Sequence, residues 1–168
     1  VLNIVPFLSF VTCSHETTRL FLEMCEKYMK KGDKVLDVGC GSGVLGIASL
    51  LMGAESAVGV DIDDVAVRTA KENAEINGVA DRFTGICGSF TDKVTGKYDI
   101  VLANIVADAI MFLSKGVKDF MKDDAVYIMS GIIDTRAEEV KESVGKDFDI
   151  IEEHLEKGWV CLAAKAKK

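Results

Sequence analysis

The residues with the clearest chemical potential form a glycine-rich loop between two carboxylates. The loop runs from Asp37 to Gly43 (DVGCGSG), and Asp61 follows it at about the 20-residue spacing of a dinucleotide-binding fingerprint. Residues 41–46 also fit the pattern G-x-G-x-x-G. Glycines at such a place allow a tight turn and let a ligand approach the backbone of the following helix. The pattern alone indicates a nucleotide-containing ligand, and a nicotinamide cofactor is the first candidate.

Asp37 favours a different nucleotide. It ends a short apolar run directly before the glycines, so its carboxylate would face a ligand at the N-terminus of the next helix. A pyrophosphate would be repelled there, whereas an ammonium or sulfonium would be attracted by about 1 kcal/mol or more. S-adenosylmethionine has this charge pattern, and its ribose diol suits both oxygens of Asp61. We therefore predict an S-adenosylmethionine site that includes Asp37, Gly39, Gly41, Gly43 and Asp61.

The elements that must position these residues alternate along the chain. Apolar periodicity predicts helices over residues 17–29, 44–52, 63–77, 110–121 and 135–144. Strands are expected over residues 34–38, 57–60, 82–87, 98–103, 125–129, 148–155 and 159–166, and residues 1–14 as loop or short strand. This order predicts a three-layer Rossmann-like α/β fold with a mostly parallel seven-stranded sheet and an antiparallel C-terminal strand pair. Ligands of such sheets bind beyond the carboxyl ends of the strands.

Composition narrows the class of protein. The 168 residues are 49% apolar and 28% charged, which excludes a disordered polymer and a membrane protein and predicts one domain over residues 1–168. Twenty basic against 27 acidic residues give a net charge of −7, which argues against an extended nucleic-acid surface. The five cysteines are scattered and form no C-x-x-C pair, so we expect neither a zinc site nor a disulfide framework. Free cysteines of this kind indicate a protein of the reducing cytoplasm. The first residues lack the basic region of a signal peptide and are expected to be mature chain.

The motifs together resemble a known enzyme family. The segment from Asp37 to Gly43 and the following Gly59-Val-Asp-Ile-Asp63 look like class I S-adenosylmethionine-dependent methyltransferases. Four further pieces resemble the ribosomal protein L-eleven methyltransferase family: HETT at 15–18, Cys40 in the glycine loop, ANI at 103–105 and SGI at 130–132. The resemblance covers roughly the whole chain. It implies methyl transfer from S-adenosylmethionine to an amine of a protein substrate, with a ribosomal protein favoured.

Further site residues follow from this resemblance. It implies that Thr18 contacts the cofactor and that Ser89 and Phe90 contact adenine, while Ile62 is expected against the adenine face. Asn104 follows a buried strand at the carboxyl edge, where its amide oxygen can accept a hydrogen bond from a substrate amine and aim the nitrogen at the methyl group. Asn104 is therefore the predicted catalytic residue, and capping of the next helix is its alternative role.

One loop departs from the family pattern. The family has a glycine-rich loop before the histidine, whereas Phe7, Val11 and Cys13 stand at the corresponding positions here. Side chains at such positions exclude most of the φ > 0 region and block close approach to a ligand. We expect residues 1–14 to be displaced from the pocket, which would leave the methionine end of the cofactor exposed and turnover low. Restoring the three glycines should raise activity or affinity.

Other functions remain open at this point. The family usually carries an N-terminal substrate-recognition domain, and this sequence begins after the place where that domain would end. A small-molecule or RNA methyltransferase is one alternative, and a cofactor-binding domain with little activity is another. The segment Asn104-Ile-Val-Ala107 lacks the aromatic platform that a flipped base requires, which disfavours nucleic-acid substrates.

Overall fold

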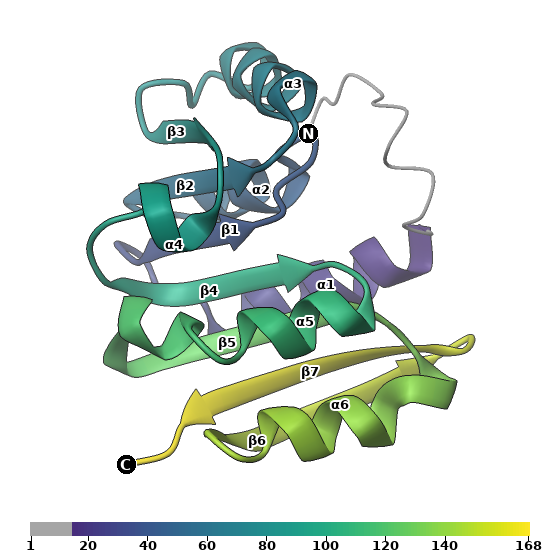
Figure 1. Cartoon of the computed structure of the whole chain (residues 1–168). Coiled ribbons are helices and arrows are strands. Elements are labelled where there is room, and N and C mark those ends of the chain that lie inside the picture. The colour runs from purple at the N-terminus through teal and green to yellow at the C-terminus, as the bar shows by residue number, and fades with distance from the viewer. Residues whose placement is uncertain (1–14) are drawn as a thin grey trace.

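The computed structural model describes residues 15–168, which form a three-layer arrangement around one sheet (Figure 1). The expected loop over residues 1–14 lies outside the described residues. The strands are β1 (Lys34–Val38), β2 (Ser56–Asp61), β3 (Phe83–Cys87), β4 (Tyr98–Asn104), β5 (Met121–Ile133), β6 (Phe148–Glu156) and β7 (Trp159–Ala166). The helices are α1 (His15–Tyr28), α2 (Val44–Leu51), α3 (Asp64–Ile76), α4 (Phe90–Lys93), α5 (Ala107–Leu113) and α6 (Ala137–Val144).

The sheet has the predicted topology. Its seven strands lie in the order β3-β2-β1-β4-β5-β7-β6. Strands β1 to β5 run parallel, and β7 pairs antiparallel with both β5 and β6. The strand order reverses between β1 and β4, so the fold leaves a crevice outside the carboxyl ends of these two strands. The predicted fold class, including the antiparallel C-terminal pair, is confirmed.

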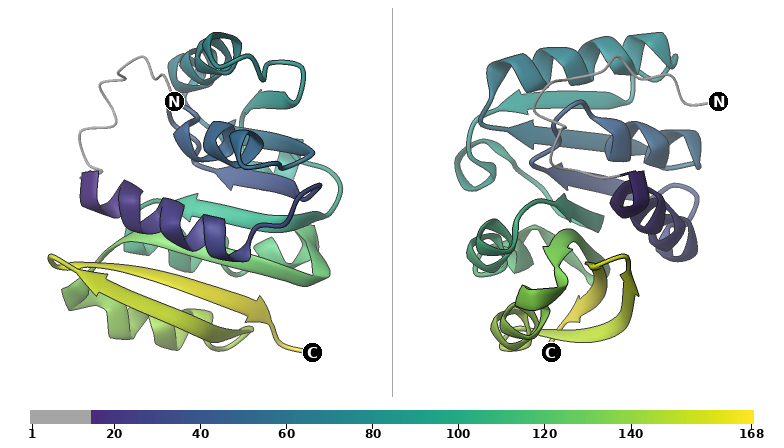
Figure 2. Two further views of the ribbon diagram at one scale, coloured as in Figure 1. Left: turned by 180° about the vertical axis from the view of Figure 1, so that it is seen from behind. Right: turned by 90° about the vertical axis from the view of Figure 1, so that its right-hand side faces the viewer.

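Helices cover both faces of the sheet, as Figure 2 shows in its edge-on view. Helices α1, α2 and α3 pack on one face, and α5 and α6 pack on the other. In β4 the side chain of Leu102 belongs to the core under α1, α2 and α3, whereas Val101 and Ala103 belong to the core under α5 and α6. Burial on both faces explains why the central strands read as nearly continuous apolar runs instead of alternating ones.

A small-residue stripe on α3 brings the glycine loop close to that helix. Ala66, Ala70 and Ala74, spaced four apart, are all buried, as the sequence predicted. A Cβ atom at Gly43 would lie 2.9 Å from Ala70 Cβ, and the φ angle of Gly43 is +81°. Only glycine permits both this conformation and this approach. The start of α2 is therefore held against α3, which fixes the loop that precedes it.

The prediction was wrong in two regions, residues 110–125 and the short segment of α4. The helix expected over residues 110–121 ends at Leu113, a short 3-10 turn spans Val117–Phe120, and Met121 already belongs to β5. Ser114 is the C-cap of this helix, and its N–H and Oγ both donate to Ile110 O, at 2.9 Å and 2.7 Å. Strand β5 is longer than the expected 125–129. Its first part was not predicted because residues 122–124 are charged and exposed and show no apolar pattern. The short helix α4 was not predicted.

Candidate functional site

A cavity of about 450 Å³ opens at the carboxyl edge of the sheet, beside the start of α5. Most of its wall is apolar, and one carboxylate, that of Asp61, lies in it. Such a cavity suits a flat ring joined to a polar sugar. Four of the predicted site residues line it, namely Gly39, Asp61, Ile62 and Ser89. The other lining residues are Val38, Val60, Gly88, Ile105, Ala109, Phe112 and Leu113.

Asp61 ends β2, and backbone donors orient its carboxylate. Its Oδ2 accepts from Gly41 N–H at 3.0 Å, and its Oδ1 accepts from Asp63 N–H at 3.0 Å. Each carboxylate oxygen retains a second lone pair, so both can still accept from a vicinal diol. The alternative role as helix cap belongs to Asp63, whose Oδ1 accepts from Val65 N–H at the start of α3.

The glycine loop lies against the end of β2. Val60 O accepts from Gly39 N–H at 2.8 Å and from Cys40 N–H at 3.1 Å. Gly39, Gly41 and Gly43 have φ angles of +70°, +54° and +81°. This backbone path carries the chain from β1 to the start of α2 along one side of the cavity, and Gly41 contributes the N–H group that holds Asp61.

Asp37 is a buried carboxylate with a missing partner. It is 1% exposed, and its Oδ2 accepts from Gly46 N–H at 3.2 Å. Its Oδ1 finds no hydrogen-bond partner among the described residues. Burial raises the pKa of Asp37 to about 7; the Gly46 hydrogen bond opposes this shift, and the charge of Asp61 adds to it. An unpartnered buried carboxylate oxygen is unfavourable until a donor or a cation reaches it, so this residue suits a ligand ammonium.

Two more unpartnered polar atoms lie on neighbouring strands. Asn104 Oδ1, at the end of β4, and Ser130 Oγ, on β5, are buried and have no hydrogen-bond partner within residues 15–168. The two residues are register partners, so their side chains leave the same face of the sheet. The Cys161 thiol, a weak hydrogen-bonding group, lies within reach of the Ser130 hydroxyl, so Asn104 Oδ1 is the less compensated of the two atoms. Buried polar atoms without partners are rare in proteins, and they mark this edge as a place for polar ligand groups.

Asn104 does not cap the next helix. The N-cap of α5 is Val106, which makes no side-chain capping bond. Because Asn104 Oδ1 accepts no hydrogen bond from the described residues, it is available to a ligand. The capping alternative for Asn104 is therefore wrong, and the amide oxygen can still accept a bond from an amine.

Other predicted residues lie partly or wholly outside the described part of the chain. Thr18 belongs to α1 and Phe90 begins α4, but the side chains of both residues lie outside the described part of the structure. Phe7, Val11 and Cys13, with the expectation of a displaced loop, belong to residues 1–14 and lie outside it as well.

Sequence reasoning missed the wall that α5 supplies. Ile105, Ala109 and Phe112 line the cavity, and the Phe112 side chain is 72% exposed. The signal was present, because Phe112 stands beside the buried stripe of Ile110 and Leu113 without belonging to it. Together with the exposed Ile62, which lines the same cavity, Phe112 forms an exposed apolar patch of the kind that marks a binding surface.

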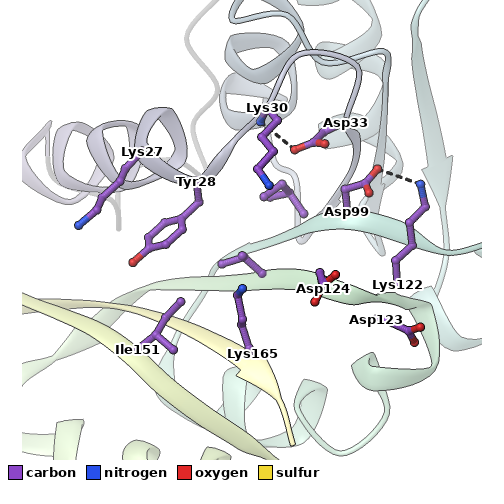
Figure 3. Close-up of a pocket in the computed structure, with 12 residues that line it drawn as sticks. Lys27, Tyr28, Lys30, Asp33, Asp99, Lys122, Asp123, Asp124, Ile151 and Lys165 are labelled. Carbon is purple, nitrogen blue, oxygen red and sulfur yellow. Dashed lines mark hydrogen bonds and ion pairs between the residues drawn. The ribbon is translucent and has the colours of Figure 1, made fainter. Parts of the chain in front are cut away.

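A larger cavity, of about 650 Å³, lies elsewhere (Figure 3). It is lined by residues at the end of α1, the starts of β4 and β5, and the outer strands, with four lysines and four aspartates among them. Part of this charge is paired internally, as between Lys122 and Asp99 at 3.0 Å. None of the predicted site residues lines this cavity. The chemistry-bearing residues gather at the carboxyl edge, and we place the site there.

The described residues offer no metal-binding cluster, and Cys40 in the glycine loop is not a reactive thiol. Among residues 15–168, no group of three or more His, Cys, Asp or Glu side chains could hold a metal ion. Cys40 is free and buried, and burial raises its pKa well above the usual value, so it is a packing residue and not a nucleophile. In the same part of the chain, no helix is both long and apolar enough to cross a membrane.

Comparison with known proteins identifies the family. The family model described as ribosomal protein L11 methyltransferase (PrmA) matches residues 1–167. The ribosomal protein L11 methyltransferase of Caldicellulosiruptor bescii is 44% identical over 99% of this chain, which spans 54% of that relative. The crystal structure of a ribosomal protein L11 methylase from Lactobacillus delbrueckii subsp. bulgaricus superimposes with a TM-score of 0.88 at 32% identity, covering 92% of this chain and 81% of that one.

A more distant structure shares the fold. The RNA methyltransferase from Salinibacter ruber, solved in complex with S-adenosyl-L-homocysteine, gives a TM-score of 0.72 at 17% identity, covering 98% of this chain and 95% of that one.

This chain spans about half the length of the curated relatives it matches. The match over nearly every residue confirms the resemblance that the motifs indicated. The chain belongs to the ribosomal protein L11 methyltransferase family.

Proposed function

We propose that this chain binds S-adenosylmethionine at the carboxyl edge of the sheet and transfers its methyl group to an amine of a ribosomal protein. The observation that carries the proposal is the pairing of the Asp61 cavity with two unpartnered polar atoms on adjacent strands, Asp37 Oδ1 and Asn104 Oδ1. Family membership supports the same reaction, and it names the substrate class.

The residues present fit the cofactor. The Asp61 carboxylate would bind the ribose hydroxyls, and the exposed apolar side chains of Ile62 and Phe112 would cover the adenine. The unpartnered oxygen of Asp37 would accept from the ammonium of the methionine part. One carboxylate for the diol and another for the cation match the charges of this cofactor and would repel a pyrophosphate.

The protein has mainly to orient the reaction. The sulfonium of the cofactor supplies a methyl group that is already activated for displacement. Asn104 Oδ1 would accept an N–H bond from the substrate amine, which aims the nitrogen lone pair and leaves the proton chemistry to solvent or substrate. Asp37 is buried and the Asn104 amide oxygen is shielded from solvent, so water would compete little for these two acceptors. A net charge of −7 suits a basic protein substrate.

Two measurements test this function. Calorimetric titration with S-adenosylhomocysteine should give one site per chain, and titration with NADH should give no heat of binding. Radiolabelled methyl transfer should then be followed with purified ribosomal protein L11, ribosomal RNA and a small-molecule extract as separate acceptors. Label in the protein supports the proposal. Binding of NADH, or label confined to RNA or metabolites, would contradict it.

A further inference from the structure

Strand β5 is irregular at the motif Ser130-Gly131-Ile132. Pairing with β7 shifts register between Met129 and Ile132, and Gly131 has a φ angle of +81°. A Cβ atom at Gly131 would lie 2.8 Å from Ile105 O and 3.0 Å from Asn104 Oδ1. The missing side chain of Gly131 thus makes room for the amide oxygen that the proposed reaction uses.

This close approach involves backbone as well as side chain. A Cβ atom closer than 3.0 Å to a carbonyl oxygen requires a shift of the backbone, because no rotamer change relieves the contact. Ile105 N–H donates to Ser130 O at 3.2 Å, so the end of β4 is attached to β5 at this point. Asn104 Oδ1 makes no hydrogen bond within the described part of the chain, so no bond to this oxygen fixes its place. A Cβ atom at position 131 would lie 3.0 Å from it, so Gly131 borders the oxygen on that side.

We propose that Gly131 is a positioning residue for methyl transfer, acting through Asn104. The inference rests on the proposed function, because it assumes that Asn104 orients the acceptor amine. A methyl group at position 131 would push the Ile105 carbonyl group and the Asn104 amide oxygen out of place. A displacement of about 1 Å can misalign a reacting pair and lower the rate without removing any bond to the cofactor.

The test compares two glycine substitutions that carry similar backbone strain. Gly131→Ala meets the contacts just described. Gly78 lies after α3 with a φ angle of +72°, and a Cβ atom there would have nothing within 4 Å. We expect Gly131→Ala to lower kcat about tenfold or more with the affinity for S-adenosylhomocysteine within twofold. Gly78→Ala should leave both unchanged. Equal losses of kcat in the two variants would overturn the proposal.

A double-mutant cycle tests whether Gly131 acts through Asn104. In the Asn104→Ala background, Gly131→Ala should lower kcat by less than about twofold, since its target is gone. An undiminished effect in that background would overturn the proposal. Thermal unfolding of every variant serves as the control that each one is folded.

A readout without turnover separates this inference from the proposed function. The NMR signals of the Asn104 side-chain amide should shift in Gly131→Ala and stay in place in Gly78→Ala. Unmoved signals in Gly131→Ala would overturn the positioning role. A wild-type chain that transfers no methyl group to any acceptor would instead contradict the proposed function, whatever the amide signals show.

Discussion

Asp61 Oδ2 accepts a hydrogen bond from Gly41 N–H at 3.0 Å, so one carboxylate joins the end of β2 to the glycine loop after β1. Its other oxygen accepts from Asp63 N–H, which starts the turn into α3. Both loops beside the cavity therefore depend on the carboxylate that is proposed to bind the ribose. Removing it should affect the ligand and the geometry of the loop together.

Asp61→Ala should weaken binding of S-adenosylhomocysteine by roughly 1.5–3 kcal/mol for each hydrogen bond to the charged group that is lost. Calorimetric titration measures this loss. Asp61→Asn keeps the volume and one acceptor oxygen, so an intermediate affinity is expected. Asp64→Ala, at a carboxylate 68% exposed on α3, is the control and should bind as the wild type does. Unchanged affinity in Asp61→Ala would show that the residue only shapes the loops.

Asp37 should make the stability of the protein depend on pH. Because burial raises its pKa to about 7, the folded chain holds this proton more tightly than the unfolded chain does. The free energy of unfolding should therefore fall as pH rises from the usual pKa of 3.8 to about 7, and should not change further above that. Asp37→Asn removes the titration, so its stability relative to the wild type should rise by about 1 kcal/mol or more between pH 5 and pH 8. Urea unfolding at the two pH values measures this difference.

Ligand affinity should change in the opposite direction. The ionised Asp37 attracts an ammonium, so Asp37→Asn should bind S-adenosylhomocysteine about tenfold or more weakly at pH 7.5. The wild-type affinity should rise between pH 5.5 and 7.5, whereas the variant affinity should vary less. A variant that gains stability and keeps full affinity would mean that Asp37 does not contact the ligand.

The fold was predictable because turn residues, helix periodicity and apolar runs in the sequence all indicate the same order of strands and helices. Glycines stand where strands end, Ala70 faces Gly43, and apolar runs match strands buried on both faces. The wrong helix boundary near Leu113 arose because the apolar spacing of Val117 and Phe120 continues a helical stripe through a 3-10 turn. Pairing with neighbouring strands, which a local pattern does not contain, decides that Met121 extends β5.

The site was predictable only where it follows the strand ends. Asp37, Asp61 and Asn104 were predicted as site residues because each follows a buried run in the sequence, and the structure places all three toward the carboxyl edge of the sheet. The wall from Ile105 to Phe112 was missed, since its place depends on how α5 packs across the crevice. The close approach of Gly131 to Asn104 joins two strands distant in sequence and could not be derived from spacing.

The exposed apolar wall should contribute to affinity and little to stability. Ile62 is 83% exposed and Phe112 is 72% exposed, so shortening either side chain removes few contacts within the fold. Ile62→Ala and Phe112→Ala should each weaken binding of S-adenosylhomocysteine roughly threefold to tenfold, since apolar area covered by the ligand is lost. Leu155→Ala, at a side chain 65% exposed on β6, is the matched control. A drop in melting temperature without a change in affinity would contradict this assignment.

Asn104→Ala should separate catalysis from binding. The amide oxygen has no hydrogen-bond partner among the described residues, so its removal breaks no hydrogen bond there and should leave the melting temperature nearly unchanged. If the oxygen orients the acceptor amine, kcat should fall about a hundredfold while the affinity for S-adenosylhomocysteine stays within a small factor. Asn104→Asp keeps an acceptor oxygen at the same place and should recover part of the rate. Parallel losses of kcat and cofactor affinity in Asn104→Ala would instead place this side chain on the methionine part of the cofactor.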